Sequence, residues 1–240
     1  MKLINSSLPF GSDTEWQMNS CERLALVALL DYLRPRNSIE IGTQYGGSLA
    51  VLSRYSERVL SFDLNPAVPE RLKHFTNVEF VTGNSGETVP PVLSRLQEAE
   101  EPVEFVLIDG DHTARGVRQD CHSFLSARPV TTQYILMHDS FNPDVRQGIK
   151  TAGWEQCPYV KALDLDFVPG IMLSDDKLRR QMWGGFALAI LGPEERTGDL
   201  EKSASSEMAF RALYPFSAHH IVSRTSRKIG AVRRQLMKRA

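Results

Sequence analysis

The stretch "SIEIGTQYGGS", residues 38–48, passes from a short apolar run into a glycine-rich turn. Such a run is typical of a β-strand that is buried on both faces, and glycines let the backbone turn tightly and approach a ligand closely. The segment that follows, "SLAVLSRYSE" (48–57), has the amphipathic spacing of a helix. The stretch therefore predicts a strand, a tight turn and a helix, which together begin a βαβ unit.

The same alternation continues along the chain. Further strand-length apolar runs are "RVLSFD" (58–63), "VEFVTG" (78–83), "VEFVLID" (103–109) and "YILMHD" (134–139), and amphipathic segments cover 20–35, 88–100 and 113–126. Strands that alternate with helices predict an α/β fold with a doubly wound, mostly parallel sheet covered by helices on both faces. Two more apolar runs, 159–163 and 185–192, are expected to add strands at an edge, one of them antiparallel.

Composition is that of an ordinary globular chain. Its 240 residues are 42% hydrophobic and 24% charged, which favours one domain with one core. No segment approaches the roughly 18 consecutive apolar residues of a membrane helix, and residues 1–10 lack the apolar centre of a signal peptide, so we expect a cytoplasmic protein without a transmembrane segment. Three cysteines without a CxxC pair favour neither a disulfide framework nor a zinc ribbon.

The net charge of −1 conceals a basic C-terminus. Residues 224–240 hold seven basic residues and no acidic one, which leaves 21 basic and 29 acidic residues before them. We therefore predict a domain over 1–223 and a basic amphipathic tail over 224–240 that either docks on the acidic body or touches an anionic surface. Because a nucleic-acid-binding domain carries its positive charge on a folded face, no nucleic-acid partner is expected.

The predicted strands end in residues that suit ligand binding. These residues are Gly42, Asp63, Gly83, Asp109 and Asp139. In an open α/β sheet the ligand lies outside the carboxyl ends of the strands, so these residues are predicted to share one site.

The turn after the first strand bears on the identity of the cofactor. A dinucleotide fingerprint reads G-x-G-x-x-G, but Gln44 replaces its second glycine, which weakens the case for a pyrophosphate ligand. S-adenosylmethionine also binds at such a turn and needs less backbone space there. Asp63 can accept hydrogen bonds from both ribose hydroxyls of either cofactor, so it does not discriminate between them.

The run Glu40, Gly42, Gly46, Ser48 resembles the E-x-G-x-x-x-G-x-S loop of catechol-type S-adenosylmethionine-dependent O-methyltransferases. The likeness extends from about residue 21 to 191, and "DGDH" (109–112) followed by "HDS" (138–140) resembles the branch with macrolide-sugar O-methyltransferases and proteins labelled cephalosporin hydroxylases. It implies a Rossmann-like methyltransferase sheet, with Asp63 at the ribose and Gly83 and Ser85 at the adenine. The implied cofactor-binding residues are Glu40, Gly42, Gln44, Ser48, Asp63, Ser85 and Asp109.

A metal site is predicted beside the cofactor. Asp109 and Asp139 end strands that should be neighbours, and paired carboxylates suit Mg²⁺ or Mn²⁺ better than zinc. His138 is a third candidate ligand, although neighbouring side chains of a strand point to opposite faces and it could equally pack inward. The resemblance places Asn where Ser140, a poorer ligand, stands here.

His112 is the candidate general base. The catechol-type pattern commonly has a lysine base at this position, and a histidine, with an unperturbed pKa near 6.5, suits that task at neutral pH. The alternative is that His112 caps the helix that begins near Thr113, or is solvated.

The predicted function is metal-dependent transfer of a methyl group from S-adenosylmethionine to a hydroxyl of a small molecule, a sugar or glycosylated natural product, by a homo-oligomer. Residues 165–185, which include Trp183, form either an acceptor-facing loop or an edge loop without a role. Two alternatives remain: an NAD(P)-dependent oxidoreductase on a Rossmann-like sheet, and an inactive methyltransferase-like binding module.

Overall fold

The computed structural model describes residues 16–174, 179–203, 205 and 207–221. The predicted basic tail, 224–240, lies outside these residues, so the domain boundary at 223 stays a prediction. In the described part of the chain, no helix is long and apolar enough to cross a membrane.

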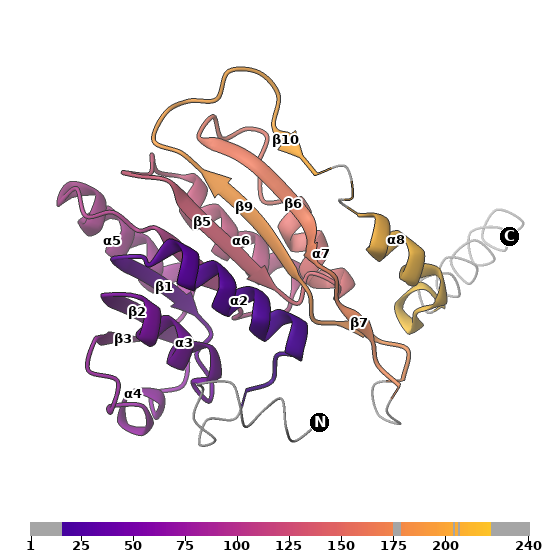
Figure 1. The fold of residues 1–240 in the computed structure, drawn as a ribbon, viewed down its shortest axis with the longest axis horizontal. Helices are drawn as coiled ribbons and strands as arrows, with labels where there is room; N and C mark the ends of the chain where they lie inside the picture. Colours follow the sequence, from indigo (N-terminus) through magenta and orange to yellow (C-terminus); the bar gives the residue numbers. More distant parts are fainter. Residues whose placement is uncertain (1–15, 175–178, 204, 206, 222–240) are drawn as a thin grey trace, which may run out of the picture.

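One eight-stranded sheet runs through the centre of the molecule in the order β10-β6-β9-β5-β4-β1-β2-β3 (Figure 1). The strands β3, β2, β1, β4 and β5 are parallel, while β9 runs antiparallel to both β5 and β6. The strands are β1 (Asn37–Ile41), β2 (Arg58–Asp63), β3 (Val78–Thr82), β4 (Phe105–Ile108), β5 (Gln133–His138), β6 (Val160–Val168), β9 (Phe186–Leu191) and β10 (Glu201–Lys202). A separate two-stranded sheet pairs β7 (Ile171–Met172) with β8 (Met182–Trp183).

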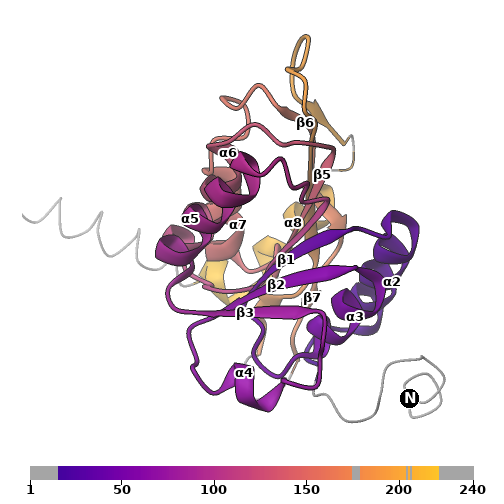
Figure 2. The ribbon, with the colours of Figure 1, turned by 90° about the vertical axis from the view of Figure 1, so that its left-hand side faces the viewer.

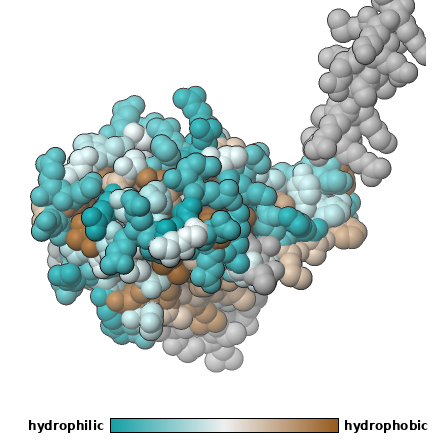
Figure 3. Space-filling model, turned by 90° about the horizontal axis from the view of Figure 1, so that it is seen from above, coloured by the Kyte–Doolittle hydropathy of each residue, from teal (hydrophilic) through white to brown (hydrophobic). Residues whose placement is uncertain are grey.

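Helices cover both faces of the large sheet, as the view along it shows (Figure 2). α2 (Ser20–Leu33) and α3 (Gly47–Tyr55) lie on one face, and α5 (Ser85–Glu98), α6 (Ala114–Leu125) and α7 (Pro143–Lys150) lie on the other. Shorter helices are α4 (Val68–Arg71), α8 (Met208–Leu213) and the 3-10 turn η1 (Tyr214–Phe216). The face of the molecule seen in Figure 3 is mostly hydrophilic, with apolar residues in patches.

The continuous apolar strands follow from this two-sided cover. All four residues of β4 are buried, and they alternate between two core clusters: Val106 and Ile108 pack toward α5, α6 and α7, while Phe105 and Leu107 pack toward α2 and α3. A strand with water on one face would place polar residues at every second position. Burial on both faces therefore explains why β4 contains only apolar residues.

The predicted fold class is confirmed. The antiparallel strand β9 is not the last in its sheet, because β6 and β10 pair beyond it. α7 was not predicted from the sequence pattern, although Asn142 caps it by accepting from the N–H groups of Asp144 and Val145, and Pro143 occupies its first turn. Only eight residues long, α7 offers a short periodic pattern, so its capping residues are the clearer signal.

Strand register brings the functional residues together. Ile108 of β4 is level with Ile41 of β1 and with Met137 of β5. The next residues along these strands are Gly42, Asp109 and His138, which therefore lie side by side at the carboxyl edge of the sheet.

Candidate functional site

A cleft of about 1020 Å³ lies along this edge. Of the predicted site residues, those that line the cleft are Gly42, Gln44, Ser48, Asp63, Gly83, Ser85, Asp109, His112, His138 and Asp139. Glu40 is fully buried and is not among the lining residues. Trp16, Met18 and Asp120 also line the cleft and were not predicted.

The turn after β1 is held by Asp63. Its Oδ2 accepts hydrogen bonds from the backbone N–H groups of Thr43 (3.0 Å) and Gln44 (2.8 Å), and Oδ1 accepts one from Asn65 (2.7 Å). Gly42 lies so close to β4 that a Cβ atom there would sit 2.1 Å from the carbonyl oxygen of Asp109. The residue predicted to bind ribose thus also shapes the turn, and only glycine fits where β1 and β4 meet.

Glu40 lies behind this turn. Its Oε1 accepts a hydrogen bond from Ser48 Oγ at 2.6 Å, and its Oε2 has no hydrogen-bond partner among the described residues. Burial raises the pKa of Glu40 to about 8, because a charge without water around it is unfavourable. Because Ser48 lines the cleft and donates to Glu40, it connects the buried Glu40 carboxyl to the cleft.

Ser85 is paired with a carboxylate that the sequence analysis missed. Its Oγ donates to Oδ1 of Asp120 at 2.6 Å, and Asp120 is only 2% exposed. Burial raises the pKa of Asp120 to about 6. Asp120 shares the buried face of α6 with Val117, Cys121 and Phe124, and a carboxylate in that apolar stripe was the available signal.

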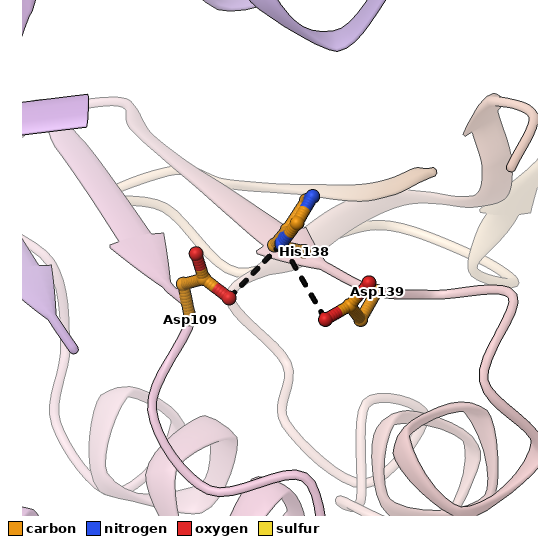
Figure 4. Close-up of side chains that lie close together, drawn as sticks. All are labelled: Asp109, His138 and Asp139. Atoms are coloured by element: carbon orange, nitrogen blue, oxygen red, sulfur yellow. Dashed lines mark hydrogen bonds and ion pairs between the residues drawn. The ribbon is translucent and has the colours of Figure 1, made fainter. Parts of the chain in front are cut away.

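Asp109, His138 and Asp139 converge on one point (Figure 4). Nδ1 of His138 lies 3.0 Å from Asp109 Oδ1 and 3.7 Å from Asp139 Oδ2. Burial alone raises the pKa of Asp109, but the neighbouring imidazoles of His138 and His112 outweigh burial and hold this pKa below its usual value. Burial opposes the charge on His138, yet Asp109 and Asp139 raise its pKa well above the usual value.

The backbone at Asp139 explains why His138 and Asp139 face the same point. β5 ends at His138, and Asp139 has φ of +55°, in the left-handed region. That conformation breaks the alternation of side chains along a strand and turns the Asp139 carboxylate toward His138. Of the two orientations considered for His138, the structure has the one directed at the carboxylates.

His112 approaches the same carboxylates from the loop before α6. Its Nε2 lies 3.0 Å from Asp139 Oδ2 and 3.7 Å from Asp109 Oδ1, and its ring meets Trp183 edge-on at 5.5 Å. Interactions with Asp109 and Asp139 raise the pKa of His112 to about 10. While these carboxylates have no other cation, the unperturbed pKa near 6.5 does not apply to His112. Thr113, not His112, caps α6.

The residues fit a divalent cation. One ligand atom each from Asp109, His138 and Asp139 lies within 4.8 Å of the others, and the described residues offer no other such group. Two carboxylates and one imidazole suit Mn²⁺ or Mg²⁺. Ser140 is fully buried, and its Oγ has no hydrogen-bond partner among the described residues.

Comparison with known proteins agrees with the fold. Residues 39–140 match a family model described as a methyltransferase domain. None of the curated proteins matches the chain. A cofactor-bound protein from MTB, Rv0187, shares the fold with a TM-score of 0.54 and 20% identity, over 81% of this chain and 96% of that one.

An O-methyltransferase from Bacillus cereus, solved in complex with SAH, aligns with a TM-score of 0.49 and 20% identity over 79% of this chain and 88% of that one. The domain match over 39–140 and the fold shared with Rv0187 both agree with the Rossmann-like methyltransferase fold.

Proposed function

We propose that the protein is a metal-dependent O-methyltransferase that moves the methyl group of S-adenosylmethionine to a hydroxyl of a small molecule, with a sugar or glycosylated natural product as the expected acceptor. The observation that carries this proposal is the convergence of two carboxylates and two imidazoles on one point of the predicted cofactor cleft. The sequence likeness to macrolide-sugar O-methyltransferases is the basis for the acceptor class.

The cleft residues suit the cofactor. The turn at 42–48 and the carboxylate of Asp63 would hold the methionine and ribose parts, and Ser85 lies where the adenine is expected. Asp109, His138 and Asp139 would hold Mg²⁺ or Mn²⁺. When bound, such a cation lowers the pKa of a coordinated hydroxyl and so makes it a better nucleophile.

His112 is the residue we propose as the acceptor of the hydroxyl proton, at Nε2. Without a cation, its pKa of about 10 keeps the imidazole protonated at neutral pH, when it cannot act as a base. Protonation beside a divalent cation is opposed by repulsion between like charges, which lowers the pKa toward the range where a histidine acts as a base. The proposed role of His112 therefore belongs to the loaded site.

Calorimetric titration with S-adenosylmethionine, S-adenosylhomocysteine, NAD and NADP, each with and without Mg²⁺, tests the cofactor. We expect the two sulfur-containing nucleosides to bind and the two dinucleotides not to bind. Binding of NAD or NADP alone would instead favour the oxidoreductase on a Rossmann-like sheet. Once an acceptor is identified, His112→Ala should lower turnover by about 10² to 10⁴ with nearly unchanged cofactor affinity. A wild-type protein that binds S-adenosylmethionine but methylates no hydroxylated acceptor would favour the binding module.

A further inference from the structure

Glu22 is a buried carboxylate next to the candidate metal ligand His138. It lies in the first turn of α2, is 1% exposed, and was not among the predicted site residues. Its Oε2 accepts from the backbone N–H of Asn19 at 2.6 Å, as the third residue of a capping box. Its Oε1 accepts from the backbone N–H of Gly185, also at 2.6 Å. A capping box alone requires neither this burial nor this distant partner.

The ring of His138 lies between Glu22 and the two carboxylates of the candidate metal site, Asp109 and Asp139. Its Nδ1 faces Asp109 and Asp139, as described above. Its Nε2 is buried and makes no hydrogen bond among the described residues, and Glu22 Oε2 lies 3.4 Å away, within ion-pair range. A buried ring nitrogen without a hydrogen-bond partner is costly, so this nitrogen needs the acceptor that Glu22 offers.

Glu22 and Asp139 are held by consecutive amides. The N–H of Gly184 donates to Asp139 Oδ1 at 2.6 Å, and the N–H of Gly185 donates to Glu22 Oε1. The second oxygen of each carboxylate faces a histidine: Asp139 Oδ2 faces His112, and Glu22 Oε2, which also accepts from the Asn19 N–H, faces His138. The turn between β8 and β9 fixes both carboxylates relative to each other.

We propose that Glu22 is a positioning residue: when a cation takes the place of the proton on Nδ1 of His138, Glu22 keeps the remaining proton on Nε2, so that Nδ1 binds the cation beside Asp109 and Asp139. A neutral imidazole carries one N–H, and only the other nitrogen can be a ligand. A carboxylate on the far nitrogen selects this tautomer, fixes the ring and raises the basicity of the ligating nitrogen. This inference rests on the metal site of the proposed function.

Glu22→Gln is the direct test, with Mn²⁺ affinity measured by calorimetry on the full chain. The carboxamide that this substitution introduces can still accept from Gly185, but it places an amide donor where Oε2 faces Nε2, which favours the wrong tautomer, and it removes the acceptor of the Asn19 N–H. We expect Mn²⁺ to bind about 10- to 100-fold more weakly. Glu22→Asp, which keeps the carboxylate, should recover part of the affinity.

Asn19→Ala is the matched control, because it removes the side-chain acceptor of the capping box and leaves Glu22 in place. It should lower stability without a comparable loss of Mn²⁺ affinity. Equal losses of Mn²⁺ affinity in Asn19→Ala and Glu22→Gln would show that Glu22 acts only through the helix cap and would overturn the inference. Wild-type Mn²⁺ affinity in Glu22→Gln would overturn it as well. A wild-type protein that binds no Mn²⁺ would overturn the metal part of the proposed function as well.

A second measurement needs no variant. In the Mg²⁺-loaded wild-type protein, long-range ¹H–¹⁵N NMR spectra of the imidazoles should show His138 with a protonated Nε2 and an unprotonated Nδ1. The reverse assignment would overturn the inference even if Glu22→Gln failed to fold.

Discussion

Gly184 donates its backbone N–H to Oδ1 of Asp139, and this contact gives the two oxygens of the carboxylate different partners. Oδ1 is engaged with the turn between β8 and β9, while Oδ2 faces His112 at 3.0 Å. A carboxylate fixed in this way cannot rotate to present both oxygens to the cleft. Its geometry toward a cation is therefore set before any ligand arrives.

Gly184→Ala should destabilise the protein and weaken Mn²⁺ binding. Gly184 has φ of +71°, and a Cβ atom there would lie 2.3 Å from Glu22 Oε1. Gly198→Ala is the control, because Gly198 also has a positive φ (+99°) but nothing lies within 4 Å of its Cβ position. Positive φ alone should cost about 1–2 kcal/mol in either variant. Urea unfolding should show a larger loss of unfolding free energy for Gly184→Ala than for Gly198→Ala. Equal losses in the two variants would contradict the close packing of Gly184 against Glu22.

Asp139→Asn should reduce Mn²⁺ affinity by more than about 10-fold, because it removes a charged oxygen ligand. Substitution of a residue that only contacts a metal ligand already lowers metal affinity by about 10-fold or more. Asp31→Asn, in an exposed pair with Arg34, should leave the affinity unchanged. Calorimetry measures both variants. The metal assignment would be falsified by wild-type Mn²⁺ affinity in Asp139→Asn.

In the cation-free protein, NMR should show His112 titrating near pH 10 instead of 6.5. Because its pKa is raised on folding, the stability from this group is fully present below pH 6.5 and is lost as the pH rises through about 10. The difference in unfolding free energy between wild type and His112→Gln should therefore shrink over that range. A titration midpoint near 6.5 would contradict the contacts with Asp109 and Asp139.

Glu40→Gln should flatten the dependence of stability on pH. With the pKa of Glu40 raised from 4.5 to about 8, the folded wild type holds a proton that the unfolded chain releases, so stability falls as the pH rises through this interval. A glutamine at this position mimics the protonated acid and can still accept from Ser48. Urea unfolding should give similar stabilities at pH 5 and a more stable variant at pH 9. The exposed Glu98→Gln serves as the control.

Asp120→Asn should relax the selectivity for adenine. Because Ser85 Oγ donates its proton to Asp120, its lone pairs remain to accept from the exocyclic amine of an adenine in the cleft. The wild-type protein should prefer S-adenosylhomocysteine to its hypoxanthine analogue, and Asp120→Asn should narrow this preference about 10-fold, the equivalent of 1.4 kcal/mol. Asp144→Asn, on α7, should keep the wild-type ratio. An unchanged ratio in Asp120→Asn would exclude this role.

The sequence was informative where function depends on strand ends. Alternating apolar runs placed Asp63 at the end of its strand and Asp109 and Asp139 directly after theirs, at the edge that the carboxyl ends of parallel strands share. Glu22 was not predicted, because it belongs to a helix before the first strand and its partner Gly185 is 163 residues away. The orientation of His138 was left open because it depends on the backbone at Asp139, which has a positive φ. Positive φ is usually predicted from a glycine, and this position has none.

The distant amide partners of Asp139 and Glu22 set an order of assembly during synthesis. The turn at 42–48 is held by Asp63 and packs against Asp109, and the Ser85 pair is complete at Asp120. Asp139 and Glu22 receive their amide donors only once Gly184 and Gly185 have left the ribosome, 45 and 163 residues after their acceptors. In a chain that ends before β9, the carboxylates around His138 would lack the turn that holds them.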